Sequence, residues 1–226
     1  MGRFGITVAI PVGPYPANQR WLPSCLESIQ QQTRQPDEVL LVCDMAGLPQ
    51  GMNHQQSYPI RTWCSPWRLG VAHAFNFGVA LAEFDLIFLM GSDDKLLPQC
   101  LEFCLRSYEK SQKPDETYFA VPIKYSDGRE DQYAPCNAAM VSKALWKRCG
   151  GFPVESSSGA PDAALISIFM KHPEAGRFEI VDGNRPLYWY RVHEETDTAQ
   201  RYSWQGVILS TRDILTQQWK APIWNQ

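Results

Sequence analysis

The chain has 226 residues and a formal net charge of −3, a length that suits one domain with its own hydrophobic core. The acidic balance argues against a protein that binds nucleic acid, so a small-molecule ligand is expected first. No apolar run is long enough to cross a bilayer, and the N-terminus lacks the pattern of a signal peptide. We therefore expect no transmembrane segment, while peripheral membrane association stays open.

Seven cysteines are spread along the chain without a C-x-x-C pair. Neither a disulfide framework nor a zinc site is therefore expected. Most of these cysteines lie among apolar residues, which is typical of buried free thiols. Free thiols suit a reducing compartment, so the sequence predicts a cytoplasmic protein.

The first part of the chain alternates strand and helix patterns. Ile6–Val12 (ITVAIPV) is expected to form a buried strand, and a helix with one apolar stripe is expected from about Leu22. Glu38–Cys43 (EVLLVC) is expected to form a second buried strand that ends at Asp44. The order strand, helix, strand predicts a parallel pair with a helical crossover.

The remaining chain continues this alternation and contains no convincing interdomain linker. We expect strands at Ile60–Cys64, Phe84–Met90, Thr117–Tyr125, Phe178–Asp182 and Pro186–Val192, and helices at about Val71–Ala82, after Pro98, at Lys143–Arg148, from Pro161, and at Ser203–Trp219.

The stretch Phe84–Asp94 (FDLIFLMGSDD) is an apolar run that ends in Gly, Ser and two aspartates. Ligands of open α/β sheets bind beyond the carboxyl ends of the strands, where Ser92, Asp93 and Asp94 would lie. Adjacent carboxylates at such a place suit a divalent cation shared with phosphate oxygens. Alternatively, Ser92 or Asp93 caps the helix that Pro98 announces, and Asp94 is solvated.

A series of short motifs follows in a defined order. They are AIPV at 9–12, CLESIQQQT at 25–33, Asp44, the G-x-x-x-A-x-N spacing of Gly70, Ala74 and Asn76, GSDD at 91–94, GGF at 150–152, Asp162 and RVH at 191–193. In this order the chain resembles the family 2 glycosyltransferases of the GT-A fold from Ile6 to His193. Members of that family are inverting enzymes that use nucleotide-diphosphate sugars and usually a divalent metal.

The motifs depart from the family pattern at four positions. Cys43, Gly91 and Pro161 stand where the family usually has an acid, and Phe75 stands where it usually has an arginine. These losses leave open a second hypothesis, a nucleotide-sugar-binding protein that has lost catalysis. A sugar nucleotidyltransferase is a third, although PVGPYPANQR is a poor match to the Gly-rich triphosphate loop of such enzymes.

The resemblance implies an α/β fold, a single GT-A domain with a Rossmann-like, mixed and mostly parallel central sheet flanked by helices on both faces. The domain would span residues 1–226. Its nucleotide-binding half would cover about 1–97 and its acceptor and catalytic half about 98–195, followed by a C-terminal helix and tail at about 196–226.

The resemblance also implies a set of binding residues. Mn²⁺ or Mg²⁺ would be held by Asp93, Asp94 and His193, and a nucleoside-diphosphate sugar, here a UDP-sugar, would be the donor. The nucleotide would be bound by Pro11, Val12, Asp44, Arg68, Gly70, Asn76, Ser92 and Asp93. The donor sugar or the acceptor would lie near Asn137, Gly151, Phe152 and Arg191. His193 and Arg68 also have simpler explanations as ordinary surface side chains.

Asp162 is the candidate general base, because a carboxylate suffices to take a proton from an attacking hydroxyl. Its position also has a bland explanation, since an acid in the first turn after Pro161 stabilises a helix dipole. The acceptor expected from the resemblance is a glycan, a lipid-linked glycan or a protein, with polysaccharide synthesis as the general setting.

Overall fold

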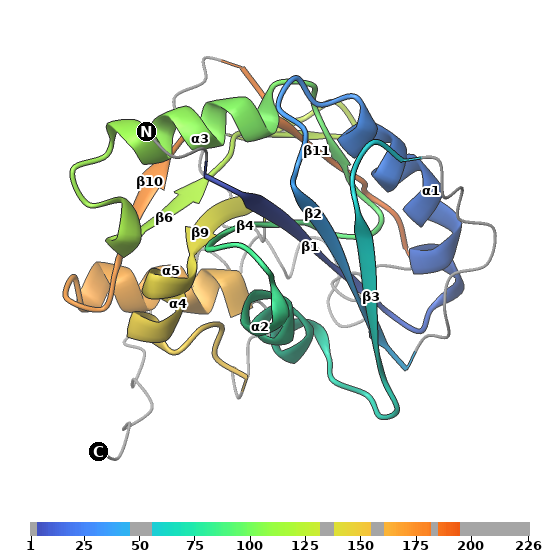
Figure 1. The fold of residues 1–226 in the computed structure, drawn as a ribbon, viewed down its shortest axis with the longest axis horizontal. Helices are drawn as coiled ribbons and strands as arrows, with labels where there is room; N and C mark the ends of the chain where they lie inside the picture. Colours follow the sequence, from blue (N-terminus) through green and yellow to red (C-terminus); the bar gives the residue numbers. More distant parts are fainter. Residues whose placement is uncertain (1–3, 46–55, 132–137, 155–160, 182–184, 195–226) are drawn as a thin grey trace.

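The structure is a computed structural model, and it describes residues 4–45, 56–131, 138–154, 161–181 and 185–194. Its centre is a seven-stranded sheet with the strand order β10-β6-β9-β4-β1-β2-β3 (Figure 1). These strands are β1 (Ile6–Val12), β2 (Glu38–Asp44), β3 (Ile60–Ser65), β4 (Leu86–Leu89), β6 (Thr117–Ala120), β9 (Ala139–Ser142) and β10 (Arg177–Ile180).

The central sheet is mixed and mostly parallel. β1 pairs in parallel with both β2 and β4, β2 pairs in parallel with β3, and β10 with β6. β9 runs antiparallel to both of its neighbours, β4 and β6. Strands buried on both faces explain the nearly continuous apolar runs of β1, β2 and β4.

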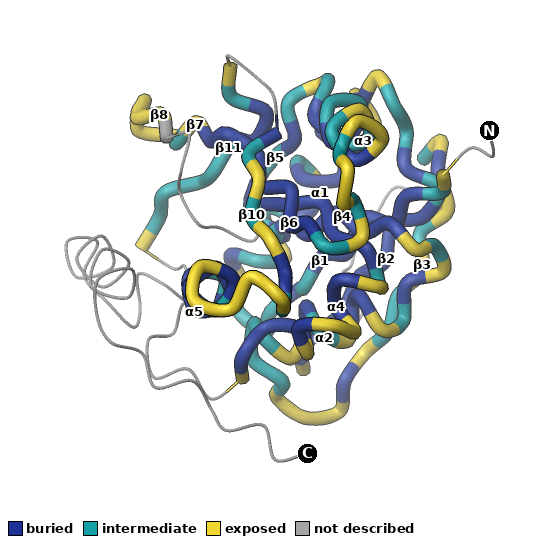
Figure 2. Tube along the Cα trace, turned by 90° about the vertical axis from the view of Figure 1, so that its left-hand side faces the viewer, coloured by how far each residue is buried: buried dark blue, intermediate teal, exposed yellow. Residues whose placement is uncertain are grey.

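Helices cover both faces of this sheet, and their buried residues form separate clusters. The helices are α1 (Pro16–Gln30), α2 (Val71–Leu81), α3 (Cys100–Lys110), α4 (Lys143–Cys149) and α5 (Pro161–Lys171). α1 and α3 pack on one face, and α2, α4 and α5 pack on the other (Figure 1). Figure 2 shows the buried strands between helices whose outer sides are exposed. The predicted α/β architecture is therefore confirmed.

A second, smaller sheet brings distant segments together. It has the order β5-β11-β7-β8 and consists of β5 (Lys95–Leu96), β11 (Tyr188–Tyr190), β7 (Ile123–Tyr125) and β8 (Glu130–Asp131). β5 directly follows the two aspartates, and β11 directly precedes Arg191. These two strands pair in antiparallel, Tyr188 with Leu96 and Trp189 with Lys95. The pairing therefore places the end of the GSDD motif beside the start of the RVH motif.

The first helix begins six residues before the predicted start at Leu22. Pro16 takes one of the first two helical positions, where its fixed φ suits a helix start, and Pro23 lies inside the helix. Pro23 is on the exposed side, and the apolar stripe, including Leu22, Cys25 and Ile29, is buried against the sheet. The free energy gained by packing that stripe offsets the loss of the backbone hydrogen bond that an internal proline removes.

The predicted strand Thr117–Tyr125 was wrong as one element. The chain leaves the central sheet after Ala120 and enters the small sheet at Ile123, because Pro122 lacks the N–H that a continuous ladder needs. The carbonyl of Pro122 instead accepts hydrogen bonds from the N–H groups of Leu187 and Tyr188. A 3₁₀ turn, Pro114–Glu116, precedes β6.

The expected helix at Ser203–Trp219 lies outside the described residues, so the single-domain span of 1–226 stays a prediction. Within the described ranges, no helix is long and apolar enough to cross a membrane.

Candidate active site

The carboxyl ends of β1, β2 and β4 meet at one edge of the central sheet. Val12 pairs with Cys43 there, so Asp44 lies one residue beyond the end of β1. Asn18, in the first turns of α1, donates from Nδ2 to Ser92 Oγ at 3.2 Å. Predicted nucleotide-binding residues of three strand ends, Pro11, Val12, Asp44 and Ser92, thus share this edge.

Asp93 and His193 come together across the site. His193 Nε2 lies 3.0 Å from Asp93 Oδ2, and the two side chains are 15% and 17% exposed. A carboxylate oxygen and an imidazole nitrogen are both suitable ligands for Mn²⁺. Within the described part of the chain, no group of three His, Cys, Asp or Glu side chains converges to hold a metal. The pair would thus supply two ligands and leave the other positions to substrate and water.

Asp94 points into the protein rather than toward the pair. Its carboxylate accepts a hydrogen bond from the Tyr188 hydroxyl at 2.6 Å and another from the Arg191 N–H at 2.8 Å. The residue is 3% exposed. Burial, and next the neighbouring charge of Asp93, raise the pKa of Asp94 well above its usual value, against the effect of the two hydrogen bonds. Asp94 therefore anchors the acidic turn to β11.

Gly91 leaves no room for the acid that the family usually has there. A Cβ at this position would lie 2.7 Å from Asp94 Oδ2 and 2.9 Å from Asp93 Oδ1, closer than real Cβ contacts. The Gly91 N–H donates to the Tyr188 hydroxyl at 3.0 Å. The two neighbouring carboxylates thus occupy the space that a side chain at residue 91 would need.

Arg191 is clamped between two tryptophans beside the acidic turn. Its guanidinium carbon lies 3.7 Å from the ring centroid of Trp21 and 4.6 Å from that of Trp189. Its Nε donates to the carbonyl oxygen of Asp93 at 2.8 Å. Stacking between two indole faces holds a guanidinium in one orientation. Arg191 therefore fixes the backbone of Asp93.

Trp21 was not recognised in the sequence as a site residue. The helix was expected to start at Leu22, which placed Trp21 outside it. In the structure Trp21 lies in the second turn of α1, facing Arg191. An earlier helix start, signalled by Pro16, would have placed Trp21 on the same helical surface as Asn18, three residues before it.

Asp44 holds the start of α2. Its carboxylate accepts hydrogen bonds from the N–H groups of Leu69 and Gly70, the latter at 2.9 Å. Gly70 has a φ of 77° at the N-terminal boundary of the helix, a conformation that favours glycine. Asp44 is 5% exposed. Two backbone N–H groups stabilise the carboxylate at this place and fix the loop before α2.

Arg68 also lies at this edge. It donates to the Tyr15 hydroxyl, and its guanidinium stands 5.3 Å from the Tyr15 ring centroid. Tyr15 immediately precedes α1, so this contact joins the loops that follow β1 and β3. Tyr15 is a second residue that the sequence interpretation did not include.

The side chain of Asn76, which was predicted to bind the nucleotide, is directed at the Gly-Gly-Phe loop. Its side-chain amide exchanges two hydrogen bonds with the backbone of Phe152. Gly151, with a φ of 79°, lies against this amide. The structure thus brings together Asn76, Gly151 and Phe152, which the sequence had divided between two functions.

Asp162 lies in the first turn of α5 and is partly buried. Burial raises the pKa of its carboxyl to about 6, and hydrogen bonds from the backbone N–H groups of Ala163 and of Asp162 itself oppose the shift. A base with a pKa near neutrality suits proton abstraction at physiological pH. Asn137 lies outside the described residues.

The chain belongs to glycosyl transferase family 2, whose model matches residues 8–149. An uncharacterized glycosyltransferase of Haemophilus influenzae is 29% identical over an alignment of 141 residues, and the match covers 58% of this chain and 52% of that protein. The chain therefore spans about half the length of this curated relative.

Solved structures of TarS from S. aureus have the same fold. The complex of TarS 1-349 with UDP-GlcNAc matches with a TM-score of 0.68 and 14% identity over 93% of this chain and 65% of that one. TarS 1-349 without a named ligand matches with a TM-score of 0.65 and 15% identity over 83% of this chain and 60% of that one. The predicted GT-A fold is thereby confirmed.

Proposed function

We propose that this protein is a metal-dependent, inverting glycosyltransferase that moves a sugar from a nucleoside-diphosphate sugar to an acceptor hydroxyl. Membership of glycosyl transferase family 2 supports the general reaction. The observation that carries the proposal is the Asp93–His193 pair, 3.0 Å apart at the carboxyl end of β4. The setting would be glycan or polysaccharide synthesis.

The proposal assigns Mn²⁺ or Mg²⁺ to Asp93 and His193. Both ions commonly take few protein ligands at such sites, and substrate phosphates and water supply the others. When bound, the metal acts as a Lewis acid that stabilises the departing diphosphate. Asp94, which the sequence interpretation placed among the ligands, would serve this site by holding the turn through Tyr188 and Arg191.

The nucleotide would lie over the ends of β1 and β2. Backbone groups of Pro11 and Val12 and the carboxylate of Asp44 would read the base, since a carboxylate that already accepts two N–H groups retains further acceptor capacity. Arg68 and Ser92 border the same edge. Gly70 would act through the loop that Asp44 fixes.

Asp162 would act as the general base. The acceptor oxygen forms a bond to the anomeric carbon as the bond from that carbon to the diphosphate oxygen breaks, and the hydroxyl proton passes to the Asp162 carboxylate. Attack from the face opposite the leaving group inverts the anomeric centre. Gly151, Phe152 and Arg191 would border the donor sugar or the acceptor.

A UDP-sugar is the proposed donor, because one structural neighbour, TarS, was solved with UDP-GlcNAc and also with UDP. The proposed acceptor is a glycan, a lipid-linked glycan or a protein. The cytoplasmic location expected from the cysteines stays a prediction.

A second candidate function is nucleotide-sugar binding without transfer. Two residues favour it, Gly91 and Pro161, because each stands where an acid is usual in the family. One panel separates the two functions: UDP-, GDP- and dTDP-sugars are incubated with Mn²⁺ or Mg²⁺, with donor binding by calorimetry and nucleoside diphosphate release as the two readouts. Metal-dependent release supports the transferase, binding without release supports the second candidate, and no binding to any donor rejects both.

A further inference from the structure

The side-chain amide of Asn76 makes three hydrogen bonds, two to the Gly-Gly-Phe loop and one to the neighbouring Trp146. Asn76 Oδ1 accepts from the Phe152 N–H at 2.9 Å and from Trp146 Nε1 at 3.1 Å. Asn76 Nδ2 donates to the Phe152 carbonyl at 3.0 Å. The amide thus pairs with Phe152 as a peptide group pairs in a β-ladder, and it fixes the direction of the chain there.

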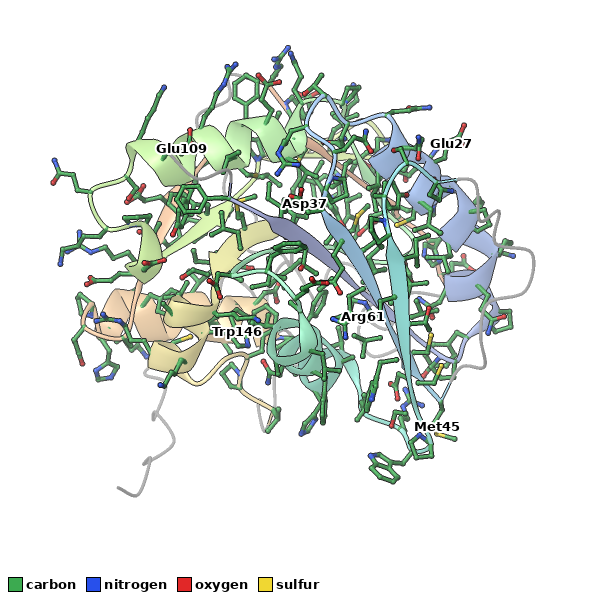
Figure 3. The ribbon with its side chains drawn as sticks, in the orientation of Figure 1. Glu27, Asp37, Met45, Arg61, Glu109 and Trp146 are labelled. Atoms are coloured by element: carbon green, nitrogen blue, oxygen red, sulfur yellow. The ribbon has the colours of Figure 1, made fainter. Side chains whose placement is uncertain are left out.

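The loop is built around this amide. Gly151 has a φ of 79°, and a Cβ there would lie 2.5 Å from Asn76 Oδ1 and 2.7 Å from Trp146 Nε1. The Phe152 ring is 1% exposed and packs edge-on against Trp146 and Phe75, at centroid distances of 4.9 and 5.7 Å. Figure 3 shows Trp146 beside α2. Hydrogen bonds and close packing therefore specify one loop position.

The helix that carries Asn76 is attached at its N-terminus to the edge of the central sheet where β1, β2 and β4 end, which is the proposed nucleotide edge. Asp44 holds the N–H groups of Leu69 and Gly70 at the start of α2. Asn76 follows Gly70 by six residues, about 9 Å along a helix. α2 is thus a rigid connection between the carboxylate at the end of β2 and the Gly-Gly-Phe loop.

We infer that Asn76 is a positioning residue, which sets the Gly-Gly-Phe loop relative to the nucleotide edge and does not itself bind the nucleotide. The effect on turnover rests on the proposed function, in which Asp162 is the general base. The chain continues from the Gly-Gly-Phe loop to α5, which carries Asp162, so a displaced loop would displace the base. Displacing a reacting group by about 1 Å can cost about 10²-fold in rate. Asn76 therefore acts on turnover and not on UDP affinity.

The test is Asn76→Ala in the full chain. We expect UDP affinity, measured by calorimetry with Mn²⁺ present, to stay within about twofold, and kcat for nucleoside diphosphate release from UDP-GlcNAc to fall on the order of 10²-fold. Hydrogen exchange at the Phe152 N–H should become faster, while exchange at Leu69 and Gly70 should not change. That exchange readout needs no activity.

Gln32→Ala is the matched control. Like Asn76, Gln32 makes three hydrogen bonds through its side-chain amide, from Nε2 to the carbonyls of Ser28 and Leu97 and to Oε1 from the Leu101 N–H. It joins α1 to α3 away from the Gly-Gly-Phe loop. We expect a comparable loss of thermal stability with unchanged kcat, so stability loss alone would not produce the Asn76→Ala result.

A second variant approaches the same contact from the loop. Gly151→Ala places a methyl group against Asn76 Oδ1, and we expect the same fall in kcat with UDP affinity retained. A loss of UDP affinity in Asn76→Ala would show that Asn76 is a nucleotide ligand, and unchanged exchange at Phe152 would overturn the positioning role. If the wild-type chain binds UDP but releases no product, the proposed function fails while the exchange result still decides the inference.

Discussion

Asp93 and His193 are 100 residues apart in the chain and 3.0 Å apart in the fold. The small sheet makes this possible, because β5 follows Asp93 and Asp94 and pairs with β11, which precedes Arg191 and His193. Arg191, Tyr188 and the buried Asp94 then hold the pair in place.

Asp93→Ala is expected to weaken metal-dependent binding of a UDP-sugar at least tenfold, because it removes one of the two proposed protein ligands. Calorimetry with and without Mn²⁺ measures this. Asp127→Ala is the matched control, since Asp127 is an exposed turn residue paired with Arg129. Equal affinity in wild type and Asp93→Ala, with Mn²⁺ and without it, would refute the metal role of Asp93.

Asp162→Asn is expected to bind the donor normally and to lose transfer by about 10²- to 10⁴-fold, the usual contribution of a general base. The wild-type rate should rise with pH through about 6, as the carboxyl with this raised pKa loses its proton. Initial rates between pH 5 and 8 check both points. An Asp162→Asn enzyme with wild-type rates would exclude Asp162 as the base.

Asp162 should also affect stability in a pH-dependent way. Because its pKa is raised on folding to about 6, the carboxyl favours the folded state most at low pH, and this contribution is lost as the pH rises through 6. Each pKa unit corresponds to about 1.4 kcal/mol, and the shift is from 3.8 to about 6. Ionised Asp162 therefore lowers the free energy of unfolding by an amount on the order of 3 kcal/mol. Asp162→Asn should therefore raise the free energy of unfolding at pH 8 and change it less at pH 5. Urea titrations at both pH values measure this, and equal effects would contradict it.

Tyr188→Phe removes the hydroxyl that bonds both Asp94 and the Gly91 N–H. We expect the free energy of unfolding to fall by about 1–3 kcal/mol, because buried polar groups lose a hydrogen-bond partner. We also expect weaker metal-dependent donor binding. Tyr58→Phe is the control, since Tyr58 donates one hydrogen bond to the Leu26 carbonyl. In that variant the free energy of unfolding should fall by about 1 kcal/mol, and donor affinity should not change. Unchanged donor binding in Tyr188→Phe would show that the Tyr188 hydroxyl does not support the donor site.

Gly91→Asp restores the acid that the family usually has, yet we expect it to impair this protein. Its Cβ would meet both neighbouring carboxylates at less than 3 Å, and overpacking of this kind costs about 1–3 kcal/mol. Gly91→Ala should show the same loss of stability without adding a charge. Thermal melting and Mn²⁺-dependent UDP binding are the measurements, and tighter binding in Gly91→Asp would contradict the expectation.

Local sequence patterns predicted the elements well where one signal was dominant. Ile6–Val12 formed a strand with the predicted bounds, and the predicted helix at about Val71–Ala82 was confirmed to within one residue. The predictions were wrong where two signals competed. Pro23 resembled a helix start although Pro16 was the actual one, and Thr117–Tyr125 resembled one strand although Pro122 divides it between two sheets.

The sequence by itself determined the α/β class, the parallel pairing of the first strands and the family, because periodicity and motif order are properties of the chain. Only the tertiary structure decided what each polar side chain faces. Asp93 and Asp94 are adjacent in sequence, yet one meets His193 and the other is buried against Tyr188. Asn76 and Asp44 likewise contact loops far along the chain. Such partners depend on how strands pair and helices pack, and no local pattern encodes that.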